Sequence, residues 1–420
     1  MSPWSRRRSL AALGALALAG CASPAARGAP HVVVAGGGFG GATLARYLRL
    51  WSAGRVAVTL VEREPQALCC PMSNLVVVGQ GTLADLTQGY GGLTRLGVRV
   101  VQGEVVGVDA AARAVRLADG RRLAGQRLVL APGVGFMTDA VPGLALALAR
   151  GEAVQAWKAG PETLALRAQL AALPDGGVVL ISVPRAPYRC PPGPYERACL
   201  VAEFLQRRKP RAKLLLRDAN AEITSKKALF TQVFAQRYAG VLEYQPNTEL
   251  REVVGRTAQF DFDAVKADVL NLIAPQRAGD LLHGAGLARI NGRWADVDWR
   301  TLALRDAPGV HVLGDATLAA PGMPKSATMA NQHAKVAAAA ILAELDGKPI
   351  NPAPLLINTC YSFVAADAAA HVASVHQWDA AEATVKPAAG AGGVSPAASA
   401  QEARLARAWF ASLRADSFAA

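Results

Sequence analysis

The stretch HVVVAGGGFGGATLARYLRL (His31–Leu50) passes from a run of β-branched residues through a glycine-rich turn into an apolar helical pattern. The segment that follows, RVAVTLVERE (Arg55–Glu64), has the composition of a second buried strand. A strand, a glycine turn, a helix and another strand, in this order and length, are typical of a βαβ nucleotide-binding unit. This stretch therefore predicts an α/β fold that contains a parallel sheet.

The glycine turn contains the pattern Gly36-x-Gly38-x-x-Gly41, and Glu62 stands at the end of the following strand. Glycines allow the backbone to approach a pyrophosphate at the N-terminus of a helix, where the helix dipole favours an anion. A carboxylate at the position of Glu62 can accept hydrogen bonds from a ribose hydroxyl. Because strand, helix and acid agree, the pattern predicts a dinucleotide site rather than a turn without a ligand.

Two further motifs favour FAD as that dinucleotide. A strand that ends in Gly314-Asp315 would place the Asp315 carboxylate against the ribityl hydroxyls of a flavin, and VLAPG (Val129–Gly133), with Ala131 and Gly133, is the turn that accompanies it. The segment PGMPKS (Pro321–Ser326) leads into a helix whose N-terminus would point at the N1/O2 edge of the flavin. The helix dipole and Lys325 would stabilise the negative charge there on reduction. The alternative for Lys325 is a solvated loop lysine.

A second βαβ pattern follows, with a strand at GGVVLISVP (Gly176–Pro184), a helix at YERACLVAEFLQRR (Tyr195–Arg208) and a strand at AKLLLRDA (Ala212–Ala219). The turn between the first strand and this helix, within SVPRAPYRCPPGPYERA (Ser182–Ala198), is rich in proline, has one glycine and carries Cys190. Proline lacks the amide N–H that a phosphate cradle requires. We therefore predict a second dinucleotide-type domain that no longer binds a nicotinamide cofactor.

These patterns predict an α/β fold with two Rossmann-like domains of the glutathione-reductase type and a C-terminal α+β domain. Within the last region, KPAAGAGGVSPAASA (Lys386–Ala400) has the composition of a flexible linker, followed by a terminal helix at about Gln401–Leu413. The predicted division is an export signal at 1–30, an FAD-binding domain at 31–150 and 275–345, a second domain at 151–274 and a C-terminal domain at 346–420.

Composition narrows the function further. The chain of 420 residues is 52% apolar and 18% charged, which suits large buried cores. Its formal charge is +13, but no dense Lys/Arg run is interleaved with aromatic residues, so we expect no nucleic-acid partner. A basic surface can instead steer an anionic substrate or an acidic protein partner. No cluster of residues with metal-ligand spacing is apparent.

The N-terminus has the pattern of a targeting segment. SRRRSL (Ser5–Leu10) places paired arginines before a short apolar run, which predicts an export signal of the twin-arginine type and a periplasmic location. LAGC (Leu18–Cys21) is similar to a lipoprotein cleavage box, which would place a lipid anchor on Cys21. A plain signal cleaved nearer AARGA is the alternative. In either case disulfides can persist in the mature protein.

Three longer motifs carry a family resemblance: YRCPPGPYERA (Tyr188–Ala198), NTCYSFV (Asn358–Val364) and CPMSNLV (Cys70–Val76), together with GGVSP (Gly392–Pro396). From about His31 onwards the chain resembles the two-dinucleotide-fold flavoprotein disulfide reductases. Within them it is similar to the flavoprotein subunit of flavocytochrome c sulfide dehydrogenase, a relative of the sulfide:quinone oxidoreductases.

The resemblance implies that Cys190 and Cys360 form a redox disulfide over the flavin and that Glu196 is an acid close to it. It also implies a thioether from Cys70 to the flavin 8α-methyl group and an aromatic ring, Trp409, near the flavin. Alternatives remain open at this point. Cys69 is a rival for the flavin bond, the doublet could be structural thiols, the distant pair could be a purely structural bridge, and Glu196 could be only a helix N-terminal carboxylate.

The activity that the resemblance implies is oxidation of sulfide at the disulfide, with electrons passing through FAD to a c-type cytochrome. No Cys-x-x-Cys-His haem-attachment motif occurs in the chain, so the haem would lie on a separate subunit. The rival functions are a sulfide:quinone oxidoreductase, an NAD(P)H-dependent disulfide or sulfur reductase, and a flavin-bearing assembly or docking subunit without activity.

Overall fold

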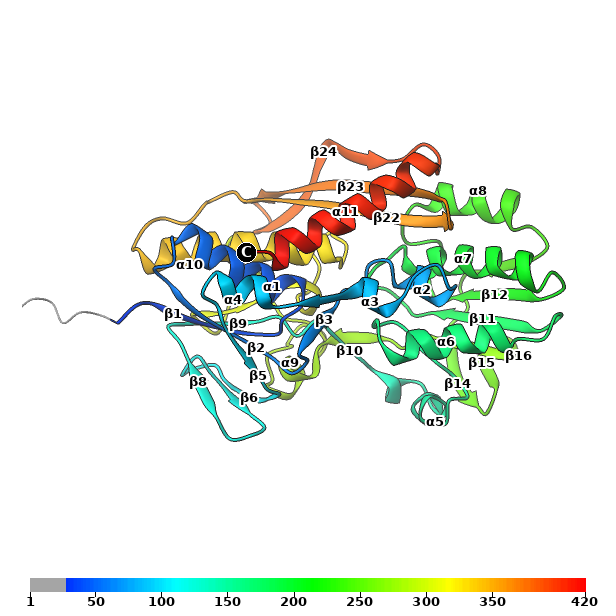
Figure 1. Ribbon diagram of the computed structural model, residues 1–420, viewed down its shortest axis with the longest axis horizontal. Helices are drawn as coiled ribbons and strands as arrows, with labels where there is room; N and C mark the ends of the chain where they lie inside the picture. Colours follow the sequence, from blue (N-terminus) through cyan, green and yellow to red (C-terminus); the bar gives the residue numbers. More distant parts are fainter. Residues whose placement is uncertain (1–27) are drawn as a thin grey trace, which may run out of the picture.

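The computed structural model describes residues 28–420, which form two regions at the ends of one long axis and a third region along the side of both (Figure 1). The predicted export signal and Cys21 lie outside the described residues. The first region is built on a seven-stranded sheet whose central strands are parallel. In spatial order its strands are β19 (Val297–Asp298), β20 (Ala303–Leu304), β21 (Val310–Val312), β9 (Arg127–Leu130), β1 (His31–Ala35), β2 (Ala57–Glu62) and β5 (Arg99–Gln102).

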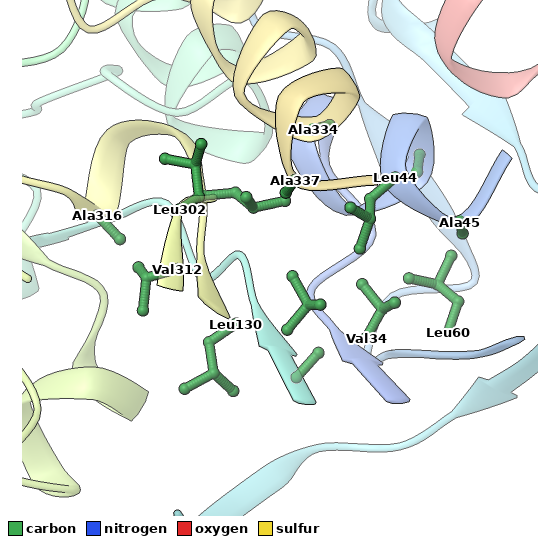
Figure 2. Close-up of a cluster of buried hydrophobic side chains, with 14 of the residues drawn as sticks. Val34, Leu44, Ala45, Leu60, Leu130, Leu302, Val312, Ala316, Ala334 and Ala337 are labelled. Atoms are coloured by element: carbon green, nitrogen blue, oxygen red, sulfur yellow. The ribbon is translucent and has the colours of Figure 1, made fainter. Parts of the chain in front are cut away.

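The predicted strand–turn–helix–strand unit is confirmed. Strand β1 leads through the glycine turn into α1 (Phe39–Trp51), and β2 pairs parallel with β1. Helix α10 (Ala327–Leu345) packs beside α1 on the same face of the sheet, and Figure 2 shows Leu44 of α1 and Ala337 of α10 in the apolar layer above the strands. Alanines let α10 pack closely in this layer, since bulky side chains would separate the helices.

Smaller elements surround the first sheet. A β-meander is formed by the antiparallel strands β6 (Val105–Asp109), β7 (Ala114–Leu117) and β8 (Arg122–Ala124). The loop after β2 carries β3 (Gln66–Leu68), α2 (Ser73–Val77), α3 (Leu83–Leu86), β4 (Thr87–Gly89) and α4 (Gly91–Arg95). Two segments of the chain connect this region to the second one. The outgoing segment contains β10 (Val134–Phe136) and α5 (Leu144–Ala149), and the returning segment contains β18 (Gln276–Ala278) and α9 (Asp280–Gly284).

The second region contains the second predicted βαβ unit, and it lies at the opposite end of the long axis (Figure 1). Its four-stranded parallel sheet has the order β13 (Leu242–Gln245), β12 (Lys213–Asp218), β11 (Val178–Val183) and β17 (Val269–Leu272). Three helices and a small antiparallel sheet complete it: α6 (Pro161–Ala172), α7 (Gly193–Arg208), α8 (Lys227–Arg237), β14 (Leu250–Val254), β15 (Thr257–Phe260) and β16 (Ala264–Lys266).

The C-terminal region spans the other two along one side of the molecule (Figure 1). It consists of an antiparallel sheet of β22 (Leu355–Ala365), β23 (Ala368–Asp379) and β24 (Thr384–Val394), followed by α11 (Ala400–Phe418). Strand β22 contacts both α10 and α7. Strand β22 therefore lies between the first and second regions.

The prediction of a flexible linker over Lys386–Ala400 is wrong for most of its length. Residues up to Val394 belong to β24, which pairs with β23 and buries Val385 completely. Glycines 390, 392 and 393 have positive φ. The glycine-rich composition, which is typical of linkers, here allows the irregular backbone of an edge strand. The terminal helix exists but extends to Phe418, beyond the predicted end. Over residues 28–420 no helix combines the length and the apolar character that crossing a membrane requires.

Candidate active site

A cleft with about 1260 Å³ of empty space lies where the three regions meet. It is lined by the first glycine turn, the loop after β2, the proline-rich turn before α7, the start of α10, strand β22 and helix α11. Most of the site residues predicted from the sequence line it: Gly38, Cys70, Ala131, Gly133, Cys190, Glu196, Gly314, Asp315, Cys360 and Trp409.

The glycine turn forms one end of the cleft. Two of its glycines allow close backbone packing, and a third leaves space for a ligand. A Cβ on Gly36 would lie 2.4 Å from the carbonyl oxygen of Ala131, and a Cβ on Gly41 would lie 1.9 Å from that of Gly36. At Gly38, by contrast, a Cβ would meet nothing within 4 Å, so the backbone there is open to a ligand. Glu62 accepts a 2.6 Å hydrogen bond from the amide of Gly37, which fixes the carboxylate beside the turn.

Asp315 has a buried carboxylate oxygen whose surroundings point to a ligand. Its Oδ1 atom is buried without a hydrogen-bond partner among the described residues, and burial raises the pKa of the carboxyl. An unsatisfied buried oxygen costs free energy, so such a group in a cleft points to a ligand donor. A sugar-alcohol hydroxyl satisfies it. Together with the glycine turn, this oxygen fits FAD.

The start of α10 closes another side of the cleft. Ser326 caps the helix by accepting the amide of Met329, and Ser326, Ala327 and Ala330 line the cleft. The positive end of the α10 dipole is therefore directed at the ligand space, as the sequence predicts.

Lys325 does not reach the cleft. Its ammonium donates to the carbonyls of Asp315 and Thr317 and lies 3.7 Å from the centroid of the Trp294 ring. Burial lowers its pKa to about 7. The expected contact of this ammonium with the flavin edge does not fit this geometry, because the ammonium is held by the two carbonyls and the Trp294 ring. The solvated-lysine alternative does not fit either, since the side chain is only 5% exposed.

The cysteine doublet separates into two environments. Cys69 packs in the apolar core, 2% exposed, and burial raises the pKa of its thiol to about 12. Cys70 lines the cleft, and its Sγ lies 3.3 Å from Nη2 of Arg189 and 3.5 Å from the amide nitrogen of Ala159. Of the two thiols, Cys70 is the one placed to react with a ligand in the cleft.

Cys190 and Cys360, far apart in the sequence, meet in the same cleft. Both are free thiols in the structure, both line the cleft, and each side chain shifts the pKa of the other. Cys190 has a left-handed backbone, with φ of 57°, and its amide donates to the carbonyl of Lys325. Such a conformation is uncommon outside glycine, so the surrounding contacts hold the thiol in place.

The two thiols shift each other's pKa in opposite directions. The interaction with Cys360, together with burial, raises the pKa of Cys190, whereas the interaction with Cys190 lowers the pKa of Cys360. Glu196, in the first turn of α7, accepts hydrogen bonds from the Phe363 amide at 2.9 Å and from Asn74 at 3.0 Å. Burial raises its pKa. The carboxyl faces inward, so it is more than a solvated helix-cap acid.

Several lining residues were not predicted from the sequence. Arg197, 1% exposed, ties the regions together through Asn74, Asn271 and the carbonyls of Gln155 and Ala156, and it stacks on Trp157. Tyr361 stacks against Trp409 at 5.6 Å between ring centroids. Asn74 stands in the CPMSN motif and Arg197 follows Glu196, so their neighbours in the sequence are the signal that could have revealed them. Cys199, by contrast, is fully buried in the core, away from the cleft lining.

The second unit differs from the first in the contacts of its acid and in the residues of its turn. Asp218, at the end of β12, is the counterpart of Glu62, but its carboxylate accepts hydrogen bonds from Tyr195, Tyr244 and Asn220. The turn from β11 to α7 is occupied by the ring of Tyr188, which is 2% exposed. The acid is satisfied within the chain, and the described part of the turn leaves no glycine cradle at the helix start.

Comparison with known families agrees with this geometry. Residues 163–274 match the family model "Sulfide dehydrogenase (flavocytochrome c) flavoprotein chain, central". Residues 352–418 match "Flavocytochrome c sulphide dehydrogenase, flavin-binding", and residues 30–163 match "Pyridine nucleotide-disulphide oxidoreductase".

Individual proteins give the same picture. The chain matches a sulfide dehydrogenase (flavocytochrome c) flavoprotein chain from Chlorobaculum thiosulfatiphilum with 51% identity over 49 residues. The match covers 12% of this chain and 100% of the sequence of that relative. The chain is 23% identical over 313 residues to the mitochondrial sulfide:quinone oxidoreductase of Mus musculus, covering 71% of this chain and 67% of that one. The sulfide:quinone oxidoreductase structure from Aquifex aeolicus superposes with a TM-score of 0.76, at 18% identity and 92% coverage of both chains.

The last of these similarities shows the fold, with its two dinucleotide-binding domains and C-terminal sheet. The family models and the relative from Chlorobaculum establish more: the chain is a flavoprotein oxidoreductase that belongs to the family of flavocytochrome c sulfide dehydrogenase flavoprotein chains.

Proposed function

We propose that the protein oxidises sulfide at the Cys190–Cys360 pair and delivers the electrons, through FAD in the cleft, to a c-type cytochrome subunit. The observation that carries the proposal is the meeting of these two thiols within a cleft that also holds the glycine turn and the unpartnered oxygen of Asp315. A purely structural bridge would not need this neighbourhood, since it stabilises a fold wherever it closes a loop.

The residues of the chain perform the sulfur chemistry. In the oxidised pair, hydrosulfide attacks one sulfur, a persulfide forms on that cysteine, and the other cysteine leaves as a thiolate. FAD, when bound, supplies the two-electron acceptor that passes electrons on singly. Glu196 lies close enough to influence the charge on the pair, and its raised pKa lets it hold a proton nearer to neutral pH than an ordinary glutamate.

Attachment of the flavin through Cys70 is a further part of the proposal. Support comes from the exposure of Cys70 to the cleft and from the burial of Cys69. Acid precipitation separates covalent from dissociable flavin: we expect wild-type protein and Cys69→Ala to keep yellow pellets, and Cys70→Ala to release the flavin. A flavin that stays in the Cys70→Ala pellet would contradict this assignment.

Export by the twin-arginine route, to a periplasmic location, is proposed from the sequence alone. The mass of the mature N-terminus, isolated from cells, distinguishes a lipid on Cys21 from a plain cleaved signal and from an uncleaved chain. The last result would contradict the export proposal.

The experiment that tests the activity is anaerobic mixing of purified flavoprotein with sulfide, followed by addition of cytochrome c or of a soluble quinone. We expect sulfide to bleach the flavin in wild type and in Cys199→Ala, and the rate to fall at least about a hundredfold in Cys190→Ser and Cys360→Ser. An unchanged rate in either serine variant would refute the role of the pair. Preferential reduction of quinone would favour the sulfide:quinone oxidoreductase alternative.

A further inference from the structure

Lys226 is a buried cation that the proposed chemistry has not used. It immediately precedes α8, has a left-handed backbone with φ of 55°, and its side chain is only 7% exposed. Its ammonium donates to the Ser362 hydroxyl at 2.8 Å and to the carbonyl of Cys360 at 3.3 Å. Both acceptors are neutral, and among the described residues Lys226 forms no ion pair with a carboxylate.

A buried ammonium with only neutral acceptors is costly unless an anion lies close by. The titratable groups that face Lys226 are Cys360 from β22, Glu196 from α7, Cys190 from the turn before α7 and Glu402 from α11. The two carboxyls are already engaged, because Glu196 accepts from Phe363 and Asn74 while Glu402 pairs with His371 at 2.9 Å. Of the two sulfurs, that of Cys360 is the anion this ammonium can balance, because the ammonium contacts the backbone of Cys360 and the charge on Cys360 affects it more than that on Cys190.

We propose that Lys226 is a positioning residue that holds the negative charge of the reduced pair on Cys360. The inference rests on the proposed function of that pair. In the exchange step, hydrosulfide forms a bond to Cys190 Sγ, the Cys190–Cys360 bond breaks, and Cys360 keeps the electron pair of that bond. The proton stays on the terminal sulfur of the persulfide, so atoms and charge balance. Lys226 thereby makes Cys360 the better leaving sulfur.

The titration directions agree with this geometry. The interaction with Cys190 lowers the pKa of Cys360 most, Lys226 lowers it further, and burial opposes both. Burial also lowers the pKa of Lys226, and the charge on Cys360 is the largest effect that opposes this. Each group therefore favours the charged form of the other, as expected for a cation placed to stabilise a thiolate.

The test is alkylation of the chemically reduced holoprotein over a pH series, with each cysteine followed by peptide mass spectrometry. Wild type is expected to react first at Cys360. Lys226→Met should slow Cys360 at neutral pH by roughly tenfold or more and move its pH profile upward. Lys226→Arg should restore the profile. The matched control is Lys227→Met, which removes an exposed lysine one residue away that pairs with Glu222.

Lys226→Gln keeps a donor for Ser362 without the charge, and it serves if the methionine variant does not fold. The proposal is overturned if Cys190 reacts first in wild type or if the neutral variants keep the wild-type profile for Cys360. The alkylation uses no sulfide. An effect of Lys226 without sulfide oxidation would therefore contradict the proposed function alone, while sulfide oxidation without an effect of Lys226 would contradict this inference alone.

Discussion

The two βαβ units of this chain share a topology and differ in what occupies the turn after the first strand. In the first unit, the turn at Gly36–Gly41 is open at Gly38, and Glu62 stabilises it from the next strand. In the second, a proline-rich turn carries Cys190, and the Asp218 carboxylate accepts hydrogen bonds from the Tyr195 and Tyr244 hydroxyls. The difference teaches that one fold can bind a cofactor at one turn and present a thiol at the other, because both turns lie at the carboxyl ends of parallel strands.

The largest expected effect comes from closing the first turn. Gly41→Ala places a Cβ 1.9 Å from the Gly36 carbonyl oxygen, so the turn must shift and the backbone amides lose their positions. We expect purified protein with essentially no bound flavin, measured by its absorption spectrum. Gly284→Ala is the control, because a Cβ there meets nothing within 4 Å; it should retain flavin like wild type. Full flavin content in Gly41→Ala would contradict the claim that the first turn, unlike the second, needs its glycines to bind a cofactor.

A matched pair of substitutions compares the two acids. In a Cys70→Ala background, where dissociation can be measured, Glu62→Gln should weaken FAD binding roughly tenfold, the equivalent of about 1.4 kcal/mol. Asp218→Asn should leave FAD affinity unchanged, because its carboxylate is bound within the second unit. Equal losses of FAD affinity in both variants would mean that the two acids are not functionally distinct.

The smallest effect concerns the stability of the second unit. Burial raises the pKa of Asp218, so the folded state favours its protonated form. That contribution to stability is complete below the ordinary aspartate pKa, about 3.9, and is lost as the pH rises through the raised value. Denaturant unfolding should therefore show wild type losing stability relative to Asp218→Asn as the pH increases over this window. A difference that grows in the opposite direction would contradict the assignment.

The sequence was sufficient for the elements that local patterns define. The glycine turn, both βαβ units and the alanine-rich helix α10 lie where their periodicity predicts. The failures have physical reasons. Strand β24 has the composition of a linker and becomes a strand only because β23 offers backbone partners. The Lys325 ammonium donates to the carbonyls of Asp315 and Thr317, which the local sequence does not reveal.

Most of the cleft could be predicted because its residues stand in motifs with a chemical rationale or a family resemblance. Lys226 could not, since no motif surrounds it and its importance depends on a contact with Ser362, which is distant in the sequence. Trp157 was missed for the same reason, because its stacking with Arg197 joins separate segments. Arg197 itself stands in the YRCPPGPYERA motif, but its partners are distant in the sequence.

The most direct test of the comparison is to offer the oxidised, anaerobic protein two reductants separately and to follow the flavin absorption. Sulfide should bleach the flavin rapidly, because the Cys190–Cys360 pair gives it a route. NADH and NADPH should leave the flavin oxidised, because the second turn has no cradle for a nicotinamide dinucleotide. Bleaching by a reduced nicotinamide, with no response to sulfide, would contradict the account.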